Sequence, residues 1–335
     1  MTRDPSPTPV HSDQRHDGWS RTAGAGDTHM DGVDFIGDIH GCAEQLERLL
    51  QRLGYVRRDG VWQHSERRVI FLGDFIDRGP EQRRTLGIVR PMVEHGGASA
   101  VMGNHEFNAI CYATPARDGF VRPHTDKNRH QHAAFLAEYP FGSPEHRDII
   151  SWFMTLPLFI DTEAFGVVHA CWCEDSFRTL RPHLTDTGRL SERTLSLYED
   201  KSSGVHRAVE TILKGPEHKL PPAFAFTDKD GTPRSEARLK WWTSPDLAVS
   251  QRLEFGGASL TAAQLAELDL LPPPPAHPAP DKPVFVGHYW LRGEPGPLSE
   301  RVACIDYSVA KGGKLAAYRW NGEAATVKDN FVCVG

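Results

Sequence analysis

Polar side chains that could bind metal ions follow directly after three apolar stretches of the sequence. The three runs are GDIHG at Gly37–Gly41, GDFIDRG at Gly73–Gly79 and GNHE at Gly103–Glu106. Their carboxylate and amide oxygens and their imidazole nitrogens are the ligand types that Mn, Fe, Zn and Mg accept in proteins. The runs therefore indicate a metalloenzyme.

The spacing of these side chains predicts two neighbouring cation sites. Asp38 and His40 point the same way from an extended segment, because side-chain direction repeats every two residues. A carboxylate has two oxygens and can bridge two ions, which suits Asp74. Asn104 offers a neutral oxygen, and His169 and His288 follow later apolar stretches. We expect one ion to be held by Asp38, His40 and Asp74, and the other by Asp74, Asn104, His169 and His288.

A pair of divalent ions predicts hydrolytic chemistry on phosphate esters. Two ions about 3.5–4 Å apart hold a water between them and lower its pKa enough to give hydroxide near neutral pH. The same ions bind phosphate oxygens and stabilise the charge of an in-line displacement. We expect the bridging hydroxide to attack directly, without a covalent phosphoenzyme.

Alternating strands and helices must position these groups. Apolar residues 33–36, 69–72 and 98–102 are typical of buried strands, and the glycines after them allow sharp turns. Residues 43–53 and 81–94 carry apolar residues at helical spacing. This alternation predicts a parallel or mixed sheet, with the polar side chains at its carboxyl edge, where open α/β sheets bind ligands.

The later part of the chain predicts further strands that also end in polar residues. Strand character returns at 165–169 and 284–288, and each of these segments carries a histidine at its end. Residues 301–307 and 314–320 are predicted as two strands joined as a hairpin around Gly312 and Gly313.

The five motifs together resemble a known family. GDIHG, GDFIDRG and GNHE, followed by Val168-His169-Ala170 and Gly287-His288, resemble the phosphoprotein phosphatase branch of the calcineurin-like metallophosphoesterases. That branch includes bacterial serine/threonine phosphatases and symmetrical diadenosine tetraphosphate hydrolases. The resemblance implies an α/β sandwich of two mixed β-sheets packed face to face and flanked by helices.

The resemblance also implies roles for individual residues. Asp38, His40, Asp74, Asn104, His169 and His288 match the metal ligands of the family. His105 matches the residue that protonates the leaving oxygen, and Asp77 the carboxylate that orients it. Arg78 matches a phosphate-binding arginine, and Asn104 is expected to touch the same phosphate. For the second phosphate-binding arginine, the sequence offers Arg238, with Arg234 and Lys214 as alternatives.

The chain departs from the family pattern beside two predicted ligands. Cys171 stands where the family commonly has glycine, and Tyr289-Trp290 stand where a threonine often follows the last Gly-His pair. Both changes are expected to reshape the substrate pocket. Glu106 is expected to support the site from outside the ligand set. Trp241 and Trp242 are predicted in the core, with a pocket wall as the alternative, and four histidines are expected on the surface or on helices: His124, His130, His132 and His146.

The predicted function is metal-dependent hydrolysis of phosphate monoesters, on a phosphoprotein or a small phosphorylated compound. Two divalent ions are expected as cofactors, with Mn favoured over Fe, Zn or Mg. One alternative is a symmetrical dinucleoside tetraphosphate pyrophosphohydrolase, which would use the same centre. The alternative from another class is a non-catalytic binding scaffold.

The domain organisation follows from composition. Residues 1–30 contain almost nothing apolar and are predicted to be a disordered tail. Residues 31–335 are predicted to form a single domain. Within it, residues 174–282 are predicted to be an insertion over the site, which ends in stiff proline-rich stretches at 272–275 and 278–283.

Charge and hydropathy restrict the partners. The formal net charge is −6, so no nucleic acid is expected as an obligate partner. No apolar run approaches the ~20 residues that span a bilayer, and the N-terminus has no apolar signal region. A membrane is therefore not expected as a partner. The cytoplasm is the expected location.

Overall fold

The computed structural model describes residues 32–227, 233–255, 258 and 260–335. Two mixed sheets form its centre. The six-stranded sheet has the order β17-β18-β1-β4-β5, with β19 pairing with β18, and the four-stranded sheet has the order β16-β15-β9-β8. The strands of the first sheet are β1 (Gly32–Ile36), β4 (Arg67–Phe71), β5 (Ser99–Ala100), β17 (Asp306–Tyr307), β18 (Lys314–Trp320) and β19 (Phe331–Val334). Those of the second are β8 (Phe159–Asp161), β9 (Gly166–Val168), β15 (Val284–Val286) and β16 (Val302–Cys304).

The two sheets pack face to face because their strands alternate between two apolar environments. Phe35 and Ile70 point into a core cluster that also contains Val167 and Phe285 of the other sheet. Their chain neighbours Ile36 and Phe71 belong to a second cluster, which the helices cover. This alternation follows the two-residue period of a strand. The predicted sandwich of two mixed sheets is confirmed.

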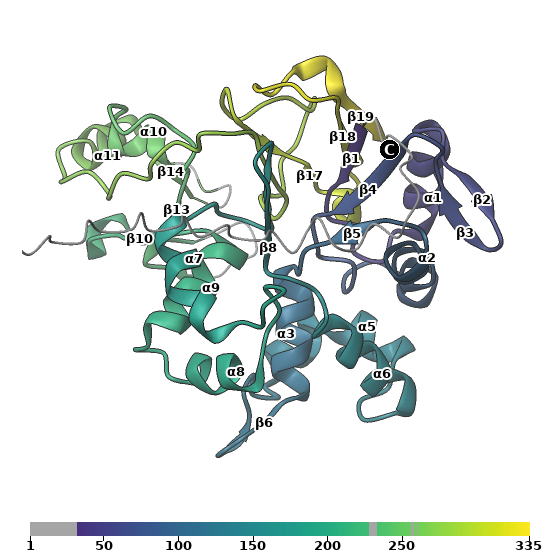
Figure 1. Cartoon of the computed structure of the whole chain (residues 1–335). Helices are drawn as coiled ribbons and strands as arrows, with labels where there is room; N and C mark the ends of the chain where they lie inside the picture. Colours follow the sequence, from purple (N-terminus) through teal and green to yellow (C-terminus); the bar gives the residue numbers. More distant parts are fainter. Residues whose placement is uncertain (1–31, 228–232, 256–257, 259) are drawn as a thin grey trace, which may run out of the picture.

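Helices cover both outer faces of the sandwich. Figure 1 shows α1 and α2 on one side of the molecule and α7 to α9 on the other. The helices are α1 (Ala43–Arg52), α2 (Gln82–His95), α3 (Asn104–Ala113), α4 (Asp126–Gln131), α5 (Ala133–Glu138), α6 (Pro144–Phe153), α7 (Glu174–Leu180), α8 (Glu192–Glu199), α9 (Gly204–Lys214), α10 (Val249–Arg252) and α11 (Ala262–Leu268). The buried face of α1 carries Leu46, Leu49 and Leu50, and that of α2 carries Leu86 and Val89, as the apolar periodicity of each segment predicts.

The segment predicted as an insertion contains α7 to α11 and a small sheet of its own. That sheet has the order β10-β13-β14. Its strands pack with α10 and α11 around a separate apolar cluster that includes Leu220, Leu239 and Leu268. The small strands of the chain are β2 (Val56–Arg58), β3 (Val61–Gln63), β6 (Pro115–Ala116), β7 (Gly119–Phe120), β10 (Glu217–Lys219), β11 (Phe226–Thr227), β12 (Pro233–Arg234), β13 (Glu236–Leu239) and β14 (Leu253–Glu254).

One strand prediction is wrong. Residues 301–307 form two strands in different sheets, because β16 pairs with β15 and β17 pairs with β18. The chain crosses between the sheets at Ile305, whose N–H donates to the carbonyl of Val286. The short turn after β17 therefore joins β17, and not the whole predicted strand, to β18.

Two further sequence predictions, on the N-terminal tail and on membrane spans, do not concern the sandwich. The predicted tail at 1–30 lies outside the described residues. Within the described part of the chain, no helix combines the length and the apolar character that crossing a bilayer requires.

Candidate metal centre and acid–base site

The predicted metal ligands follow neighbouring strand ends, most of them in loops and Asn104 in the first turn of α3. Strands β1, β4 and β5 run parallel, so the loops after them leave the same edge of their sheet. The first two loops contain the motifs that begin at Gly37 and Gly73, and the motif that begins at Gly103 forms the start of α3. In the second sheet β9 and β15 also run parallel, and His169 and His288 follow them. The topology thus gathers five loops that are far apart in the sequence.

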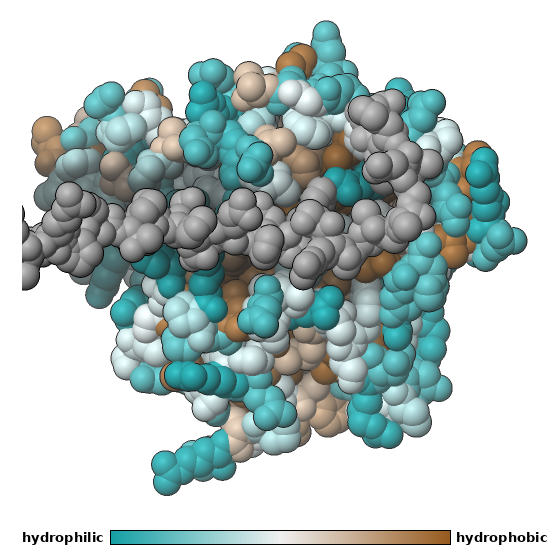
Figure 2. All heavy atoms as spheres, in the orientation of Figure 1, coloured by the Kyte–Doolittle hydropathy of each residue, from teal (hydrophilic) through white to brown (hydrophobic). Residues whose placement is uncertain are grey.

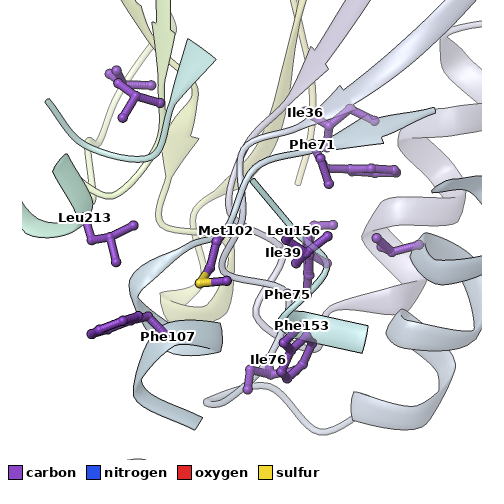
Figure 3. Packing of buried hydrophobic residues seen from close by; sticks show 14 of the residues in the cluster. Ile36, Ile39, Phe71, Phe75, Ile76, Met102, Phe107, Phe153, Leu156 and Leu213 are labelled. Carbon is purple, nitrogen blue, oxygen red and sulfur yellow. The ribbon is translucent and has the colours of Figure 1, made fainter. Parts of the chain in front are cut away.

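Apolar residues of the same loops anchor the site to the core. Figure 3 shows Ile39, Phe75, Ile76, Met102 and Phe107 within the buried cluster beneath the loops, and each is almost fully buried. The first two loops are also tied by their backbones, because the N–H groups of Ile39 and His40 both donate to the carbonyl of Asp74. The polar side chains between these anchors are therefore held in fixed positions.

Backbone strain concentrates at the site. Among the described residues, eight non-glycine residues have φ in the left-handed region, and six of them belong to these loops. Such conformations cost of order 1–3 kcal/mol each and persist only where the surroundings enforce them. The six are His40 (47°), Asp74 (51°), Asp77 (68°), Arg78 (71°), His288 (71°) and Trp290 (52°).

Glu106 joins the second and third loops. Its side chain is fully buried, and its carboxylate accepts hydrogen bonds from the backbone N–H groups of Gly103, Asp74 and Phe75 at 3.0, 2.8 and 2.8 Å. Both carboxylate oxygens are therefore used by backbone donors. This geometry agrees with a supporting position outside the ligand set.

Two imidazoles are oriented by backbone carbonyls toward Asp74. Nδ1 of His40 donates to the carbonyl of Ile76 at 2.9 Å, and Nδ1 of His169 donates to that of Leu72 at 2.7 Å. Each Nε2 then faces Oδ2 of Asp74, at 3.6 and 3.4 Å. In the neutral ring this Nε2 carries a lone pair, so both contacts place electron pairs against a carboxylate unless a cation lies between them.

The pKa shifts of these groups show the same demand for positive charge. Burial lowers the pKa of His40 to about 3, which keeps this ring neutral. Burial also lowers the pKa of His169, but attraction to Asp74 outweighs it and raises the pKa above its ordinary value. Burial raises the pKa of Asp74, yet attraction to His169 and His105 outweighs it and holds this pKa well below the usual range.

Asn104 and His288 complete the second group of donors. Oδ1 of Asn104 lies 3.1 Å from Nε2 of His169 and 2.7 Å from Nδ1 of His288. Nε2 of His288 is buried and has no hydrogen-bond partner among the described residues. One ligand atom from each of Asp74, His169 and His288 lies within 4.8 Å of the others, and the same holds for His40, Asp74 and His105. Asp74 belongs to both groups, and these donors fit a pair of divalent ions.

Asp38 forms hydrogen bonds with the loop that carries His288. Its two carboxylate oxygens accept from the backbone N–H of His288 at 3.2 and 3.0 Å. The two compact groups of possible ligand atoms do not include it. A Cβ atom at Gly287 would lie 2.1 Å from Oδ1 of Asp38, so only glycine permits this approach. Asp38 thus joins the first loop to His288 at the edge of the centre.

Asp77 lies between two histidines. Its Oδ2 accepts from Nδ1 of His105 at 2.6 Å, and its Oδ1 accepts from Nδ1 of His132 at 2.8 Å. Burial raises the pKa of Asp77, but these two hydrogen bonds outweigh it and hold the pKa far below its ordinary value. The carboxylate is therefore charged and fixed, and it leaves Nε2 of His105 pointing to the centre, 4.0 Å from Oδ2 of Asp74.

The expected placement of His132 on the surface or within a helix is wrong. His132 is only 4% exposed and lies at the junction of α4 and α5, where its ring stacks on Phe135. The spacing of His132, Phe135 and Tyr139 follows one helical face, and this apolar face was the available signal of burial. The sequence could not show that Asp77 lies opposite the ring.

The arginines predicted to bind phosphate lie around the centre. Arg78 is exposed, and its guanidinium lies 4.4 Å from the ring centroid of Trp290, which in turn stacks on His40. Arg238 is half-buried in β13, 5.5 Å from the ring centroid of Tyr289, and its charge helps to lower the pKa of His288, an effect for which burial is the larger cause.

The two alternatives to Arg238 lie in other settings. Arg234 is exposed in β12, and Lys214 forms an ion pair with Glu210 at 2.6 Å. Trp241 is buried, and its indole N–H donates to the carbonyl of Ala170 and to the hydroxyl of Tyr289. The first tryptophan is thus a core residue directly behind the strand ends that carry His169 and His288.

Comparison with known proteins matches the chain to a family model and to several relatives. The family model described as calcineurin-like phosphoesterase matches residues 33–204, just over half of the chain. An asymmetrical bis(5'-nucleosyl)-tetraphosphatase (PrpE) of Oceanobacillus iheyensis is 45% identical over 74 residues, which cover 22% of this chain and 30% of that protein. The chain therefore matches less than a third of the length of this relative.

Two further similarities extend over most of the chain. A symmetrical bis(5'-nucleosyl)-tetraphosphatase of Vibrio cholerae is 26% identical over 290 residues, covering 85% of this chain and 93% of that protein. A solved structure of a serine/threonine phosphatase from Saccharomyces cerevisiae, described as similar to human PP5, covers 92% of this chain and 80% of its own, with 15% identity and a TM-score of 0.49.

Proposed function

The chain belongs to the calcineurin-like phosphoesterase family, and on that premise we propose that it is a metal-dependent hydrolase of phosphate monoesters. One observation supports this most strongly. Asp74 is shared by two compact groups of buried His and Asp side chains, and one group includes His105, which Asp77 orients. A shared carboxylate between two donor groups is the arrangement that a dinuclear hydrolytic centre needs.

The residues proposed to hold the ions are Asp38, His40, Asp74, Asn104, His169 and His288. When bound, two divalent ions supply positive charge to phosphate oxygens and lower the pKa of water. We propose Mn as the ion, with Fe, Zn or Mg as alternatives. Unpaired cysteines support a cytoplasmic setting. The net charge of −6 supports the absence of an obligate nucleic-acid partner.

The remaining groups are proposed to act on the substrate. His105 donates a proton from Nε2 to the leaving oxygen, and Asp77 holds the ring through Nδ1. Arg78, Asn104 and Arg238 bind the oxygens of the phosphate under attack, for which the planar guanidinium fork is suited. Trp290 lies against both His40 and Arg78 and limits the directions that Arg78 can take.

A second candidate is symmetrical cleavage of dinucleoside tetraphosphates. The similarity to the Vibrio cholerae protein over 85% of this chain favours it. Both reactions would use the same centre and the same acid, and they differ in the product that is released.

A substrate panel tests the proposed function. The purified protein with Mn(II) is expected to release phosphate from 4-nitrophenyl phosphate. It is also expected to release either phosphate from a phosphoserine peptide or ADP from diadenosine tetraphosphate, and EDTA is expected to stop the reaction. Phosphate release from the peptide supports the first candidate, and ADP release from the dinucleotide supports the second. No turnover of any substrate with Mn, Fe, Zn or Mg would reject both.

We expect His132 to position the acid through Asp77. In His132→Phe the ring still packs on Phe135, but Asp77 loses one of its two donors, and kcat is expected to fall about 10-fold because small misplacements at an acid are costly. His132→Gln retains a donor and should recover most of the rate. If both variants lose the same rate and the same thermal stability, the effect is structural and the positioning role is wrong.

A further inference from the structure

A small polar cavity adjoins the proposed acid. Its wall includes Asp77 and other residues of the site described above, but also Arg122, to which the proposed function gives no role. Its volume is about 130 Å³, and the residues that line it include Arg78, Asn104, His105, Asn108, Arg122 and Gln131. Since one water occupies about 30 Å³ of liquid, the cavity has room for about four waters. A phosphate group fits within this volume.

Arg122 gives this cavity a fixed positive charge. The residue is half-buried, its backbone N–H donates to the carbonyl of Cys111 at 2.9 Å, and its guanidinium donates to Oδ1 of Asn108 at 2.7 Å and to Oε1 of Gln131 at 2.8 Å. Both side-chain partners are neutral amides. Within the described parts of the chain the guanidinium forms no ion pair with a carboxylate, so its charge is fixed in place and not neutralised.

A second polar group in the cavity wall lacks a partner. His132 lines the cavity, and its Nε2 is buried without a hydrogen bond to any described residue, while its Nδ1 is used by Asp77. A buried nitrogen without a partner is costly unless a bound group or water satisfies it. Arg122 and His132 therefore both point to a polar ligand.

We infer that this cavity is a leaving-group subsite in which Arg122 binds a phosphate carried by the leaving group itself. The inference rests on the proposed function, because it takes His105 as the acid that faces the leaving oxygen. A group attached to that oxygen would enter the cavity that His105 shares with Arg122. Of the two candidate reactions, Arg122 would therefore favour the second, in which the leaving group is an anionic nucleoside diphosphate, over hydrolysis of an ester whose leaving group is neutral.

Arg122 follows a short β-hairpin that extends from the C-terminal end of α3. The hairpin of β6 and β7 leaves the end of α3, and its tip forms a hydrophilic protrusion in Figure 2. After β7 the chain returns to α3, where Val121 N–H donates to Thr114 and Arg122 N–H to Cys111. This return places the guanidinium over α3, beside the proposed acid at its first turn.

The test compares two substrates that differ in the leaving group. In Arg122→Gln, kcat/KM for diadenosine tetraphosphate is expected to fall between about 10-fold and 100-fold, the usual loss for a hydrogen bond to a charged group. The loss for 4-nitrophenyl phosphate should be at least ten times smaller. ADP should inhibit 4-nitrophenyl phosphate hydrolysis, with an inhibition constant about 10-fold weaker in the variant. Arg122→Lys keeps the charge without the fork and should lie between wild type and Arg122→Gln.

The matched control is Arg129→Gln, which removes an exposed arginine of α4 that pairs with Asp126; its substrate ratio should equal that of the wild type. Equal losses on both substrates would show a structural role for Arg122 and overturn the inference, as would no loss, or no inhibition by ADP. A selective loss only on a phosphoserine peptide with neighbouring glutamates would also overturn it. A wild-type protein inactive on every substrate would instead reject the proposed function.

Discussion

Asp74→Asn is expected to lower the metal-dependent rate by on the order of 10³-fold or more. The reason is the position of Asp74, which belongs to both groups of possible ligand atoms and faces both His40 and His169. Asparagine has nearly the same shape and can still accept from the backbone N–H of His105, which Oδ1 of Asp74 accepts at 2.9 Å. The substitution therefore removes the bridging charge with little change in packing.

Metal content and rate together decide this prediction. The variant is expected to bind fewer than two equivalents of Mn(II) by elemental analysis and to lose turnover of 4-nitrophenyl phosphate. The matched control is Asp59→Asn, the same substitution at an exposed turn residue with nearly the same φ, 49° against 51°. Phosphate release that survives Asp74→Asn unchanged would show that the proposed centre does not perform the reaction.

His105→Asn is expected to slow substrates with poor leaving groups by about 10²- to 10⁴-fold, the usual contribution of a positioned acid. An alkyl phosphate such as phosphoserine leaves as an alkoxide and needs the proton. 4-Nitrophenolate is a stable anion and needs it far less. The loss is therefore expected to be much larger for the phosphoserine peptide than for 4-nitrophenyl phosphate.

The leaving-group dependence separates an acid from a ligand. His105 also lies in one group of possible metal ligands, so the variant's Mn(II) content must be measured. Two equivalents bound, with a rate that depends steeply on the leaving group, would support the acid role. Equal losses on both substrates together with a lost ion would assign His105 to the metal instead.

Several features of the fold are predictable because they depend on neighbours in the chain. The alternation of Phe35 with Ile36 and the leucine spacing of α1 follow from the periods of a strand and a helix. The broken strand at Ile305 shows the limit of such reasoning. Residues 302–307 are continuously apolar apart from Asp306, and only the pairing with β15 and then with β18 divides them between two sheets.

At the site, too, some features are predictable from the sequence and others appear only in the structure. Residue types and their positions after apolar strands predict a metal centre, since oxygen and imidazole ligands together suit divalent ions. The structure brings Asp74, Asn104, His169 and His288 together as this prediction requires. It also places His132 beside Asp77, a contact across 55 residues that no local spacing encodes.

The amino-acid sequence by itself therefore determined which polar side chains end the strands, and that the glycines beside them permit sharp turns. Tertiary structure alone decided which of these side chains meet, because their contacts join loops up to 250 residues apart, as between Asp38 and His288. Tertiary structure also decided which residues surround the proposed acid, His105. Arg122 and His132 lie in segments without motifs, and only packing on α3 and α5 turns them toward the proposed acid.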